Sequence, residues 1–224
     1  MIKAIIMAGG EGTRLRPLTC DMPKPMTPLC GKPVLWYIVE LLKKHDIKSA
    51  AATLLYLPEM VTDYFCSESD PDMEMSYFVE DIPLGTAGSV KNTGTFIDDT
   101  FVVISGDAMC DYNLTKAIEY HRSNGADATI ILAKVEKPLE YGVVVTDENG
   151  RVERFLEKPG WSQAFSNTVN TGIYIFEKHC LDLIPASMSF DFSKDLFPAM
   201  MEKEYKIYGY EETGYWCDIG DLSS

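Results

Sequence analysis

The residues best suited to phosphate chemistry lie in a glycine-rich stretch near the start of the chain. Residues 5–19 read IIMAGGEGTRLRPLT, in which three glycines directly follow an apolar run. Exposed backbone N–H groups converge on phosphate in turns of this kind. Arg14 and Arg16, with Lys24 further along, add planar guanidinium forks and a compact ammonium charge. The pattern predicts a loop that binds phosphate groups.

Two better-known glycine-rich loops do not fit this stretch. A P-loop requires Gly-Lys-Ser/Thr, whereas Gly12 is followed by Thr13 and Arg14. A Rossmann fingerprint requires a third glycine and an immediate helix, but Leu15 occupies that position and prolines exclude a regular helix until about residue 33. What remains is a proline-stiffened loop, which loses little entropy when it clamps a ligand. For a lone GGxG pattern, a tight turn with solvated cations is the alternative.

Two aspartates that are distant in sequence are candidates for magnesium. Asp107 follows the apolar run TFVVIS, at the carboxyl end of an expected strand, where open α/β sheets bind ligands. Asp218 lies in YWCDIGD, where its apolar neighbours require a compensating cation or donors. Magnesium uses one or two carboxylates together with phosphate oxygens and water. Either aspartate alone would equally suit a helix cap or turn, and Asp111 and Asp221 lie nearby.

Glu80, in the block EDIPLGTAGS, is a carboxylate able to pair with the edge of a nucleobase. A guanine edge presents two adjacent donors, which one carboxylate accepts together. Uracil or thymine would match an amide better, and the block contains no Gln or Asn. The pattern favours guanine, although backbone groups at Gly85 and Thr86 could read any base. A solvated strand end is the alternative interpretation of Glu80.

Composition is that of an ordinary globular protein and excludes several kinds of partner. The 224 residues are 46% hydrophobic and carry a formal net charge of −14, and such an acidic surface repels nucleic acid. No apolar run is long enough to span a membrane, and the N-terminus lacks a signal-peptide pattern. Six cysteines without regular spacing indicate reduced thiols in a cytoplasmic protein. The three histidines are isolated, which argues against zinc.

Alternating apolar and amphipathic segments predict an α/β fold, with a mixed, mostly parallel sheet flanked by helices. Strands are expected at 3–8, 50–56, 74–79, 100–105 and 128–133, and helices at 33–46, 58–67, 86–94 and 113–125. Beyond residue 135 the pattern is more antiparallel. It predicts a hairpin over 142–158 that turns at Asn149-Gly150, strands at 171–178 and 205–211, and a helix at 193–203. No linker separates the parts, so we expect one domain over 1–224.

Six sequence blocks, in order, resemble the sugar-phosphate nucleotidyltransferases, or NDP-sugar pyrophosphorylases. The blocks are GGEGTRLRPLTCDMPKPMTPLCGKP, PLGTAG, SGDAMCD, FLEKP, NTGIYIF and YWCDIGD. The chain is most similar to the bacterial mannose-1-phosphate guanylyltransferases of this family. The resemblance implies a single Rossmann-like domain of the GT-A-like, nucleotide-diphospho-sugar transferase type. Residues 1–134 would bind nucleotide, and residues 135–224 would form an antiparallel sugar-phosphate-binding portion.

The resemblance also implies roles for individual residues. Arg14 and Lys24 would be catalytic, neutralising charge around the transferred phosphoryl group, and Asp107 and Asp218 would hold magnesium. Nucleotide contacts are implied for Ala8, Gly9, Gly10, Gly12, Thr13, Arg14, Lys24, Glu80, Pro83, Gly85 and Thr86. Sugar-phosphate contacts are implied for Gly142, Glu157, Lys158, Asn170 and Thr171.

The implied reaction is attack of a sugar 1-phosphate on the α-phosphorus of a nucleoside triphosphate, with pyrophosphate as leaving group. GTP with mannose 1-phosphate is the favoured pair, and glucose 1-phosphate with UTP or dTTP is the alternative. A non-catalytic regulatory subunit that binds nucleotide-sugar is an alternative of another class, but such proteins generally lose the signature residues. Relatives usually continue beyond the point where this chain stops, so we expect a truncated chain whose missing C-terminal region could mediate a homo-oligomer.

Overall fold

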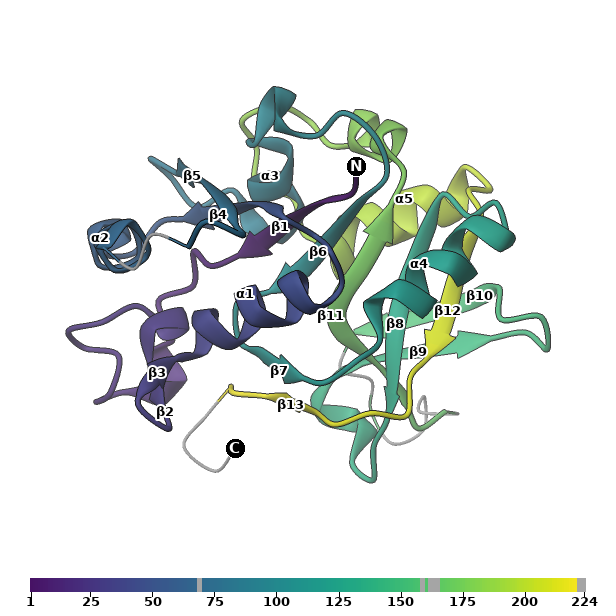
Figure 1. The fold of residues 1–224 in the computed structure, drawn as a ribbon. Coiled ribbons are helices and arrows are strands. Elements are labelled where there is room, and N and C mark those ends of the chain that lie inside the picture. The colour runs from purple at the N-terminus through teal and green to yellow at the C-terminus, as the bar shows by residue number, and fades with distance from the viewer. Residues whose placement is uncertain (68–69, 158–159, 161–165, 221–224) are drawn as a thin grey trace.

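A nine-stranded sheet forms the middle layer of the structure, with helices on both of its faces (Figure 1). The computed structural model describes residues 1–67, 70–157, 160 and 166–220. The strands are β1 (Lys3–Met7), β4 (Ser49–Leu54), β5 (Glu74–Val79), β6 (Phe101–Ser105), β8 (Ala128–Lys134), β9 (Gly142–Thr146), β10 (Val152–Glu157), β11 (Thr168–Phe176) and β12 (Ile207–Glu211). The helices are α1 (Val34–Lys44), α2 (Pro58–Ser67), α3 (Gly85–Lys91), α4 (Leu114–Ser123) and α5 (Phe197–Glu202).

Shorter elements complete the described part of the chain. Two small strand pairs lie outside the main sheet, β2 (Pro28–Leu29) with β3 (Lys32–Pro33), and β7 (Ala108–Cys110) with β13 (Trp216–Asp218). Short 3₁₀ segments are η1 (Thr13–Leu15), η2 (Lys24–Met26), η3 (Gly94–Phe96), η4 (Pro138–Glu140) and η5 (Lys178–Leu183). A π-helical turn, η6 (Phe192–Leu196), leads directly into α5.

The main sheet joins a parallel half to a mainly antiparallel half, in which β12 pairs in parallel with β8. Its main strand order is β10-β9-β11-β6-β1-β4-β5. Outside this order, β8 pairs with both β11 and β12. Strands β6, β1, β4 and β5 run parallel, so their carboxyl ends meet at one edge. Strand β11 pairs antiparallel with β6, β8 and β9, and it therefore connects the two halves. The mixed sheet confirms the predicted fold class.

The two-residue period of the strands divides the core between the two faces of the sheet. Along β1, Ala4 and Ile6 pack in a cluster that includes buried side chains of α1 and α4. Between them, Ile5 points to the opposite face and joins a cluster with side chains of α3 and α5. Figure 1 shows the same arrangement, with α1 and α4 on one face and α3 and α5 on the other. Both faces of the parallel strands are therefore covered, which explains their nearly continuous apolar sequences.

The predicted elements occur where the patterns placed them, with shifts of a few residues at their ends. The hairpin of β9 and β10 turns through Gly150, whose φ is 83°. One difference is the helix expected over residues 193–203, which is a π-helical turn followed by α5. Pro198 is the second residue of α5, and its missing N–H cannot bond to the carbonyl of Lys194 four residues earlier. The regular α-helical ladder therefore begins only after that turn.

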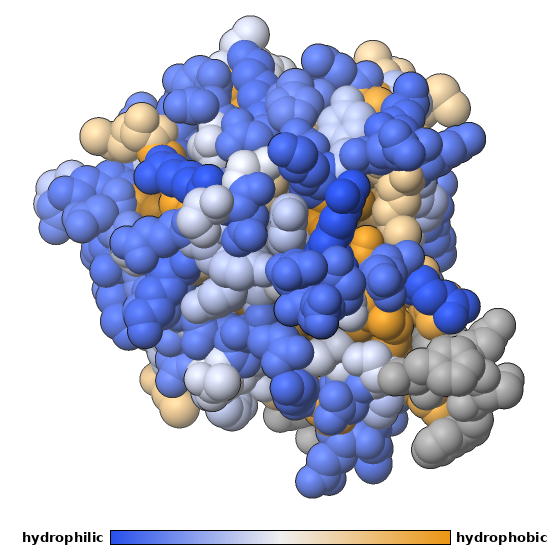
Figure 2. All heavy atoms as spheres, turned by 90° about the vertical axis from the view of Figure 1, so that its right-hand side faces the viewer, coloured by the Kyte–Doolittle hydropathy of each residue, from blue (hydrophilic) through white to orange (hydrophobic). Residues whose placement is uncertain are grey.

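Hydrophilic side chains dominate the side of the molecule on which β10 and β12 lie. Figure 2 shows hydrophobic atoms there mainly in the recesses between charged and polar groups. Within the described ranges, no helix is both long enough and apolar enough to cross a lipid bilayer.

Candidate active site

Two cavities lie side by side where the parallel strands end. The larger has a volume of about 540 Å³ and is lined by the glycine-rich loop, the ends of β1, β4 and β6, and the start of α3. The smaller, about 200 Å³, is lined by the ends of β9 and β10, by β11 and by β13. Three residues line both cavities: Arg14, Ser105 and Asp107. The predicted nucleotide and sugar-phosphate residues are thus divided between two adjoining spaces.

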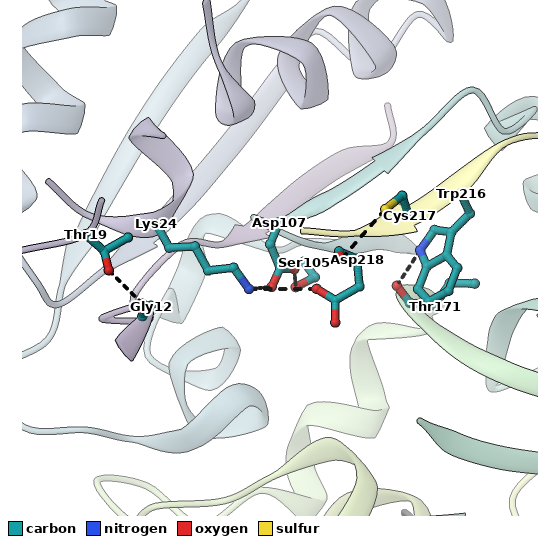
Figure 3. Close-up of polar contacts among 9 residues, drawn as sticks. All are labelled: Gly12, Thr19, Lys24, Ser105, Asp107, Thr171, Trp216, Cys217 and Asp218. Atoms are coloured by element: carbon teal, nitrogen blue, oxygen red, sulfur yellow. Dashed lines mark hydrogen bonds and ion pairs between the residues drawn. The ribbon is translucent and has the colours of Figure 1, made fainter. Parts of the chain in front are cut away.

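The glycine-rich loop bends sharply at Gly12. This residue has a φ of 65°, in the left-handed region that glycine adopts without strain. A Cβ atom here would lie 2.9 Å from Cβ of Lys24 and 3.0 Å from the methyl group of Thr19. The Thr19 hydroxyl donates a hydrogen bond to the Gly12 carbonyl at 2.7 Å (Figure 3). Glycine is therefore needed at this position so that Lys24 can pass the loop and enter the cavity.

The ammonium group of Lys24 lies close to two carboxylates, those of Asp107 and Asp218 (Figure 3). It forms an ion pair with the carboxylate of Asp107, and it is 3.8 Å from Oδ1 of Asp218. Asp218 reaches this position because β13 pairs with β7 in a register that sets it opposite Ala108. Only 12% of the Lys24 side chain is exposed, so the three charges interact with little screening by solvent.

The surroundings of Asp218 make its carboxylate a favourable place for a further positive charge. Burial, and then the neighbouring charge of Asp107, raise the pKa of Asp218, while Lys24 and Arg14 act in the opposite direction. Its Oδ1 atom is buried and accepts no hydrogen bond from the described residues. A buried carboxylate oxygen without a donor is costly unless a cation approaches it.

A magnesium ion fits this pair of carboxylates. Among the described residues, no group of three or more His, Cys, Asp or Glu is arranged to hold a metal. Magnesium does not need one, because it commonly binds one or two carboxylates and takes its other ligands from phosphate and water. Oδ1 of Asp218, which accepts no hydrogen bond from the described residues and has only the more distant Lys24 ammonium group near it, suits that chemistry beside the carboxylate of Asp107.

Ser105 holds Asp107 in place, a role that was not expected from the sequence. Its hydroxyl donates a hydrogen bond to Oδ1 of Asp107, which leaves the other carboxylate oxygen to Lys24 (Figure 3). Gly172 has a φ of 76°, and a Cβ atom there would lie 3.0 Å from Cβ of Ser105. The available signal was a serine at the end of an apolar strand, directly before Gly106 and Asp107.

Glu80 is buried at the end of β5 and lines the larger cavity. Its Oε2 atom accepts a hydrogen bond from the backbone N–H of Leu84 at 3.0 Å. Burial raises the pKa of Glu80, and the Leu84 hydrogen bond opposes that rise. The alternative of a solvated strand end is therefore wrong for this residue. A carboxylate oxygen can accept more than one hydrogen bond, so the Leu84 contact does not prevent a ligand contact.

Antiparallel strands assemble the smaller cavity. Asn170 precedes a bulge in β11, where its amide donates to the Tyr174 hydroxyl at 2.9 Å and its carbonyl oxygen accepts from Gly172 N–H at 3.0 Å. Glu157 of β10 pairs with Gly142 of β9. A Cβ atom at Gly142 would lie 3.1 Å from Oε2 of Glu157. The missing side chain thus leaves room for the Glu157 carboxylate.

An aromatic pair closes one side of this smaller cavity. The rings of Tyr141 and Trp216 meet edge to face, with centroids 5.3 Å apart. The indole N–H of Trp216 donates to the Thr171 carbonyl oxygen at 3.2 Å (Figure 3). Trp216 therefore both packs against its neighbours and lines the cavity. Ser193, from the π-helical turn, and Glu140 line it as well and were not anticipated.

The comparisons with known proteins agree with this geometry. The family model described as "Nucleotidyl transferase" matches residues 3–224. The chain belongs to the nucleotidyl transferase family. The predicted family is thereby confirmed.

Individual relatives of this nucleotidyl transferase carry different names. A UTP–glucose-1-phosphate uridylyltransferase of Synechocystis sp. is 41% identical over 99% of this chain. A mannose-1-phosphate guanylyltransferase of Mycobacterium tuberculosis is 36% identical over 98% of it. This chain spans 61% of the length of each. HddC from Yersinia pseudotuberculosis, complexed with GMP-PN, superposes with a TM-score of 0.84 at 29% identity, covering 100% of this chain and 96% of that one.

Several expected contact residues of the nucleotidyl transferase have other partners. The N–H of Ala8 donates to the Thr53 carbonyl at 3.0 Å, and Ala8 does not line the larger cavity. The Thr171 hydroxyl is buried and donates to the Ile131 carbonyl at 2.7 Å. Asp111 accepts a hydrogen bond from Tyr215 N–H at 2.6 Å and anchors β13. Lys158 and Asp221 lie outside the described residues.

The remaining expected nucleotide residues surround the larger cavity of the nucleotidyl transferase. These are Gly9, Gly10, Gly12, Thr13, Arg14, Lys24, Glu80, Pro83, Gly85 and Thr86. Gly142, Glu157, Asn170 and Thr171 line the smaller cavity. The two expected sets therefore meet where the cavities adjoin, at Arg14 and Asp107.

Proposed function

We propose that this chain transfers a nucleotidyl group from a nucleoside triphosphate to a sugar 1-phosphate, with magnesium as cofactor. The observation that carries the proposal is the meeting of two cavities at Arg14 and Asp107, beside the Lys24 ammonium group. A triphosphate in the larger cavity and a sugar phosphate in the smaller would place their phosphates at this junction. Residues 1–134 then form the nucleotide-binding portion and residues 135–224 the sugar-phosphate-binding portion of one domain.

The reaction we propose is an in-line displacement at phosphorus. A phosphate oxygen of the sugar 1-phosphate forms a bond to the α-phosphorus, the bond between that phosphorus and the α–β bridging oxygen breaks, and pyrophosphate leaves with the electron pair. The nucleophile is already an anion, so no general base is needed, and catalysis rests on positioning and charge neutralisation. This accounts for a junction that contains cations and carboxylates; its described lining residues include no histidine.

The charged residues at the junction have separate roles in this proposal. Lys24 and Arg14 stabilise charge on the α-phosphoryl oxygens and on the departing pyrophosphate. Asp107 and Asp218 hold magnesium, which when bound neutralises phosphate charge and orients both phosphates. Ser105 keeps the Asp107 carboxylate in one orientation. Glu157 and Asn170 orient the sugar through its hydroxyl groups, and Lys158 holds the incoming phosphate.

Guanine and mannose are the proposed specificity. A buried carboxylate at Glu80 suits the two adjacent donors of a guanine edge, and relatives named mannose-1-phosphate guanylyltransferase support the pair. Glucose 1-phosphate with UTP is the second candidate, because the relative at 41% identity is named a uridylyltransferase. A non-catalytic subunit is disfavoured, because Arg14, Lys24, Asp107 and Asp218 gather at one junction.

The test is pyrophosphate release in the presence of magnesium. Each of GTP, UTP, dTTP, ATP and CTP is paired with mannose 1-phosphate and with glucose 1-phosphate. We expect the strongest release from GTP with mannose 1-phosphate. Strong release only from UTP or dTTP with glucose 1-phosphate would replace the proposed specificity with the second candidate. No release from any pair would contradict the proposed reaction for this chain.

A further inference from the structure

Thr86 lines the larger cavity, yet its hydroxyl faces another segment of the chain. The hydroxyl donates a hydrogen bond to Oδ2 of Asp191 at 2.9 Å and accepts one from the backbone N–H of Phe192 at 2.9 Å. A threonine hydroxyl has a single proton. That proton is used on Asp191, so Thr86 has no side-chain donor left for a phosphate or a base.

The segment that Thr86 contacts is tightly docked on the start of α3. The Phe190 carbonyl accepts hydrogen bonds from Ala87 N–H at 2.9 Å and Gly88 N–H at 3.0 Å, and Phe190 N–H donates to the Leu84 carbonyl at 2.8 Å. A Cβ atom at Gly85 would lie 2.8 Å from that Phe190 carbonyl oxygen. Backbone packs directly on backbone here, so a displacement of either element moves the other.

Two sets of contacts connect the same segment to the smaller cavity. Asp191 accepts a hydrogen bond from Ser193 N–H at 2.9 Å, and Ser193 lines that cavity. Phe192 packs against Tyr174 with ring centroids 4.9 Å apart. The Tyr174 hydroxyl in turn accepts the amide N–H of Asn170 at 2.9 Å. Thr86 is thus connected to two lining residues of the smaller cavity, although it belongs to the larger one.

We propose that Thr86 is a positioning residue for the sugar-phosphate cavity. Through Asp191 and Phe192 it sets the places of Ser193 and Asn170, and it thereby links the nucleotide-binding helix to the sugar-phosphate contacts. The π-helical turn that begins at Phe192 is consistent with this role, because such turns are frequent at functional sites. This inference rests on the proposed function, since it assigns the smaller cavity to the sugar phosphate.

The test compares three variants by the KM of each substrate. Thr86→Val keeps the shape of the side chain and removes both hydrogen bonds, whereas Thr86→Ser keeps the hydroxyl. Thr93→Val is the matched control, because the Thr93 hydroxyl is buried just beyond the same helix and donates only locally, to the Val90 carbonyl at 2.8 Å. All three are assayed with the nucleotide and sugar phosphate that the wild-type protein prefers.

In Thr86→Val we expect the KM of the sugar phosphate to rise about tenfold, the loss that corresponds to one net hydrogen bond to a charged group. The KM of the nucleotide should stay within about twofold, and Thr86→Ser should restore both values. A rise in the nucleotide KM alone, or equal rises in both, would overturn the inference.

A second measurement does not depend on turnover. In the protein without substrates, amide hydrogen exchange of residues 188–194 should be about tenfold faster in Thr86→Val and unchanged in Thr93→Val. Unchanged exchange in Thr86→Val would overturn the proposed link. Wild-type protein that turns over no substrate pair would overturn the proposed function and this inference together. Wild-type turnover with an unaltered ratio of KM values in Thr86→Val would overturn this inference alone.

Discussion

Replacement of Lys24 by methionine removes the ammonium group that lies near two carboxylates and keeps an unbranched side chain. Lys24 Nζ pairs with Asp107 and lies 3.8 Å from Oδ1 of Asp218. Two unit charges about 4 Å apart attract by about 4 kcal/mol at an effective dielectric constant of about 20, before desolvation is subtracted. Removing one partner of a buried ion pair costs about 3–5 kcal/mol.

The side chains of Lys24, Asp107 and Asp218 are partly exposed to solvent, by 12%, 22% and 29% respectively. We therefore expect the Lys24→Met variant to lose about 3 kcal/mol of stability at pH 8, near the lower end of that range, and its Tm to fall by about 6–12 °C. The variant should still fold, because the cores on both faces of the sheet are unchanged. Thermal unfolding followed by circular dichroism measures this loss.

The catalytic effect should be larger than the effect on stability. Loss of one cationic donor to the phosphoryl centre is expected to lower kcat by about 10²–10³-fold, or about 3–4 kcal/mol of transition-state stabilisation. Pyrophosphate release at saturating substrates, measured at a temperature where the variant is folded, gives this value. The reduction should persist at high concentrations of both substrates, because Lys24 acts on charge that develops during the reaction.

The pH dependence of stability provides a separate check. Burial and Asp107 already raise the pKa of Asp218, and Lys24 opposes that rise. Without Lys24 the pKa of Asp218 rises further, so lowering the pH protonates the carboxyl group and relieves the repulsion. The difference in Tm between wild type and variant should therefore narrow between pH 8 and pH 5.

Lys3→Met is the matched control for Lys24→Met. Lys3 also forms an ion pair, with Asp98 at 2.7 Å, but it lines neither cavity. The control should keep wild-type turnover. A folded Lys24→Met protein that retains turnover within about tenfold of the wild type would refute the assigned role of the ammonium group.

Four further predictions concern single substitutions at Glu80, Gly85 and Glu157. Glu80→Gln should lower the preference for GTP over UTP by about 10–100-fold, because an amide offers one acceptor where guanine needs two; competition between the two nucleotides measures this. Burial raises the pKa of Glu80, so ionisation of this carboxyl group destabilises the folded protein as the pH rises through that pKa. The Glu80→Gln variant should therefore have a higher Tm than the wild type at pH 8, and the difference in Tm should disappear in acid. Thermal unfolding at both pH values measures this difference. Gly85→Ala should lower the free energy of unfolding in urea by about 2–4 kcal/mol, because the added Cβ would meet the Phe190 carbonyl and the residue has a φ of 71°. Gly94→Ala should lower it by about 1 kcal/mol, because Gly94 has a φ of 58° but open space around it. Equal losses in the two variants would contradict the packing argument. Glu157→Gln should raise the KM of the sugar phosphate about tenfold with the nucleotide KM unchanged, and a change in the nucleotide KM would place Glu157 elsewhere in the reaction.

Local patterns were sufficient to predict most elements of this fold. The apolar run before Asp107 marked β6 and placed the aspartate at its carboxyl end, because strand length and burial are local properties. Asn113 caps α4 through the N–H of Lys116 at 3.1 Å, as its position before the periodic segment indicates. The predicted turn at Gly150 follows from the same kind of local signal.

Contacts between distant segments could not be predicted in the same way. Lys24 and Asp107 are 83 residues apart, and only the sheet order brings them together. Asp218 reaches them through the pairing of β13 with β7, two strands of three residues each. Strands that short carry no periodic signal, so their partner and register depend on tertiary structure. The link from Thr86 to Asp191, 105 residues away, is inaccessible to sequence patterns for the same reason.

The central claim is that the bond between the α- and β-phosphates is broken and the nucleotidyl group moves to the sugar phosphate. The most direct test uses GTP labelled with ³²P at either the α or the γ position, with magnesium and mannose 1-phosphate, followed by separation of the products. We predict that the α label appears in a nucleotide-sugar and the γ label in pyrophosphate. Release of the γ label as inorganic phosphate in an assay without added pyrophosphatase would contradict nucleotidyl transfer. So would an α label that stays in the nucleoside triphosphate and its hydrolysis products both in this assay and in the same assay with UTP and glucose 1-phosphate.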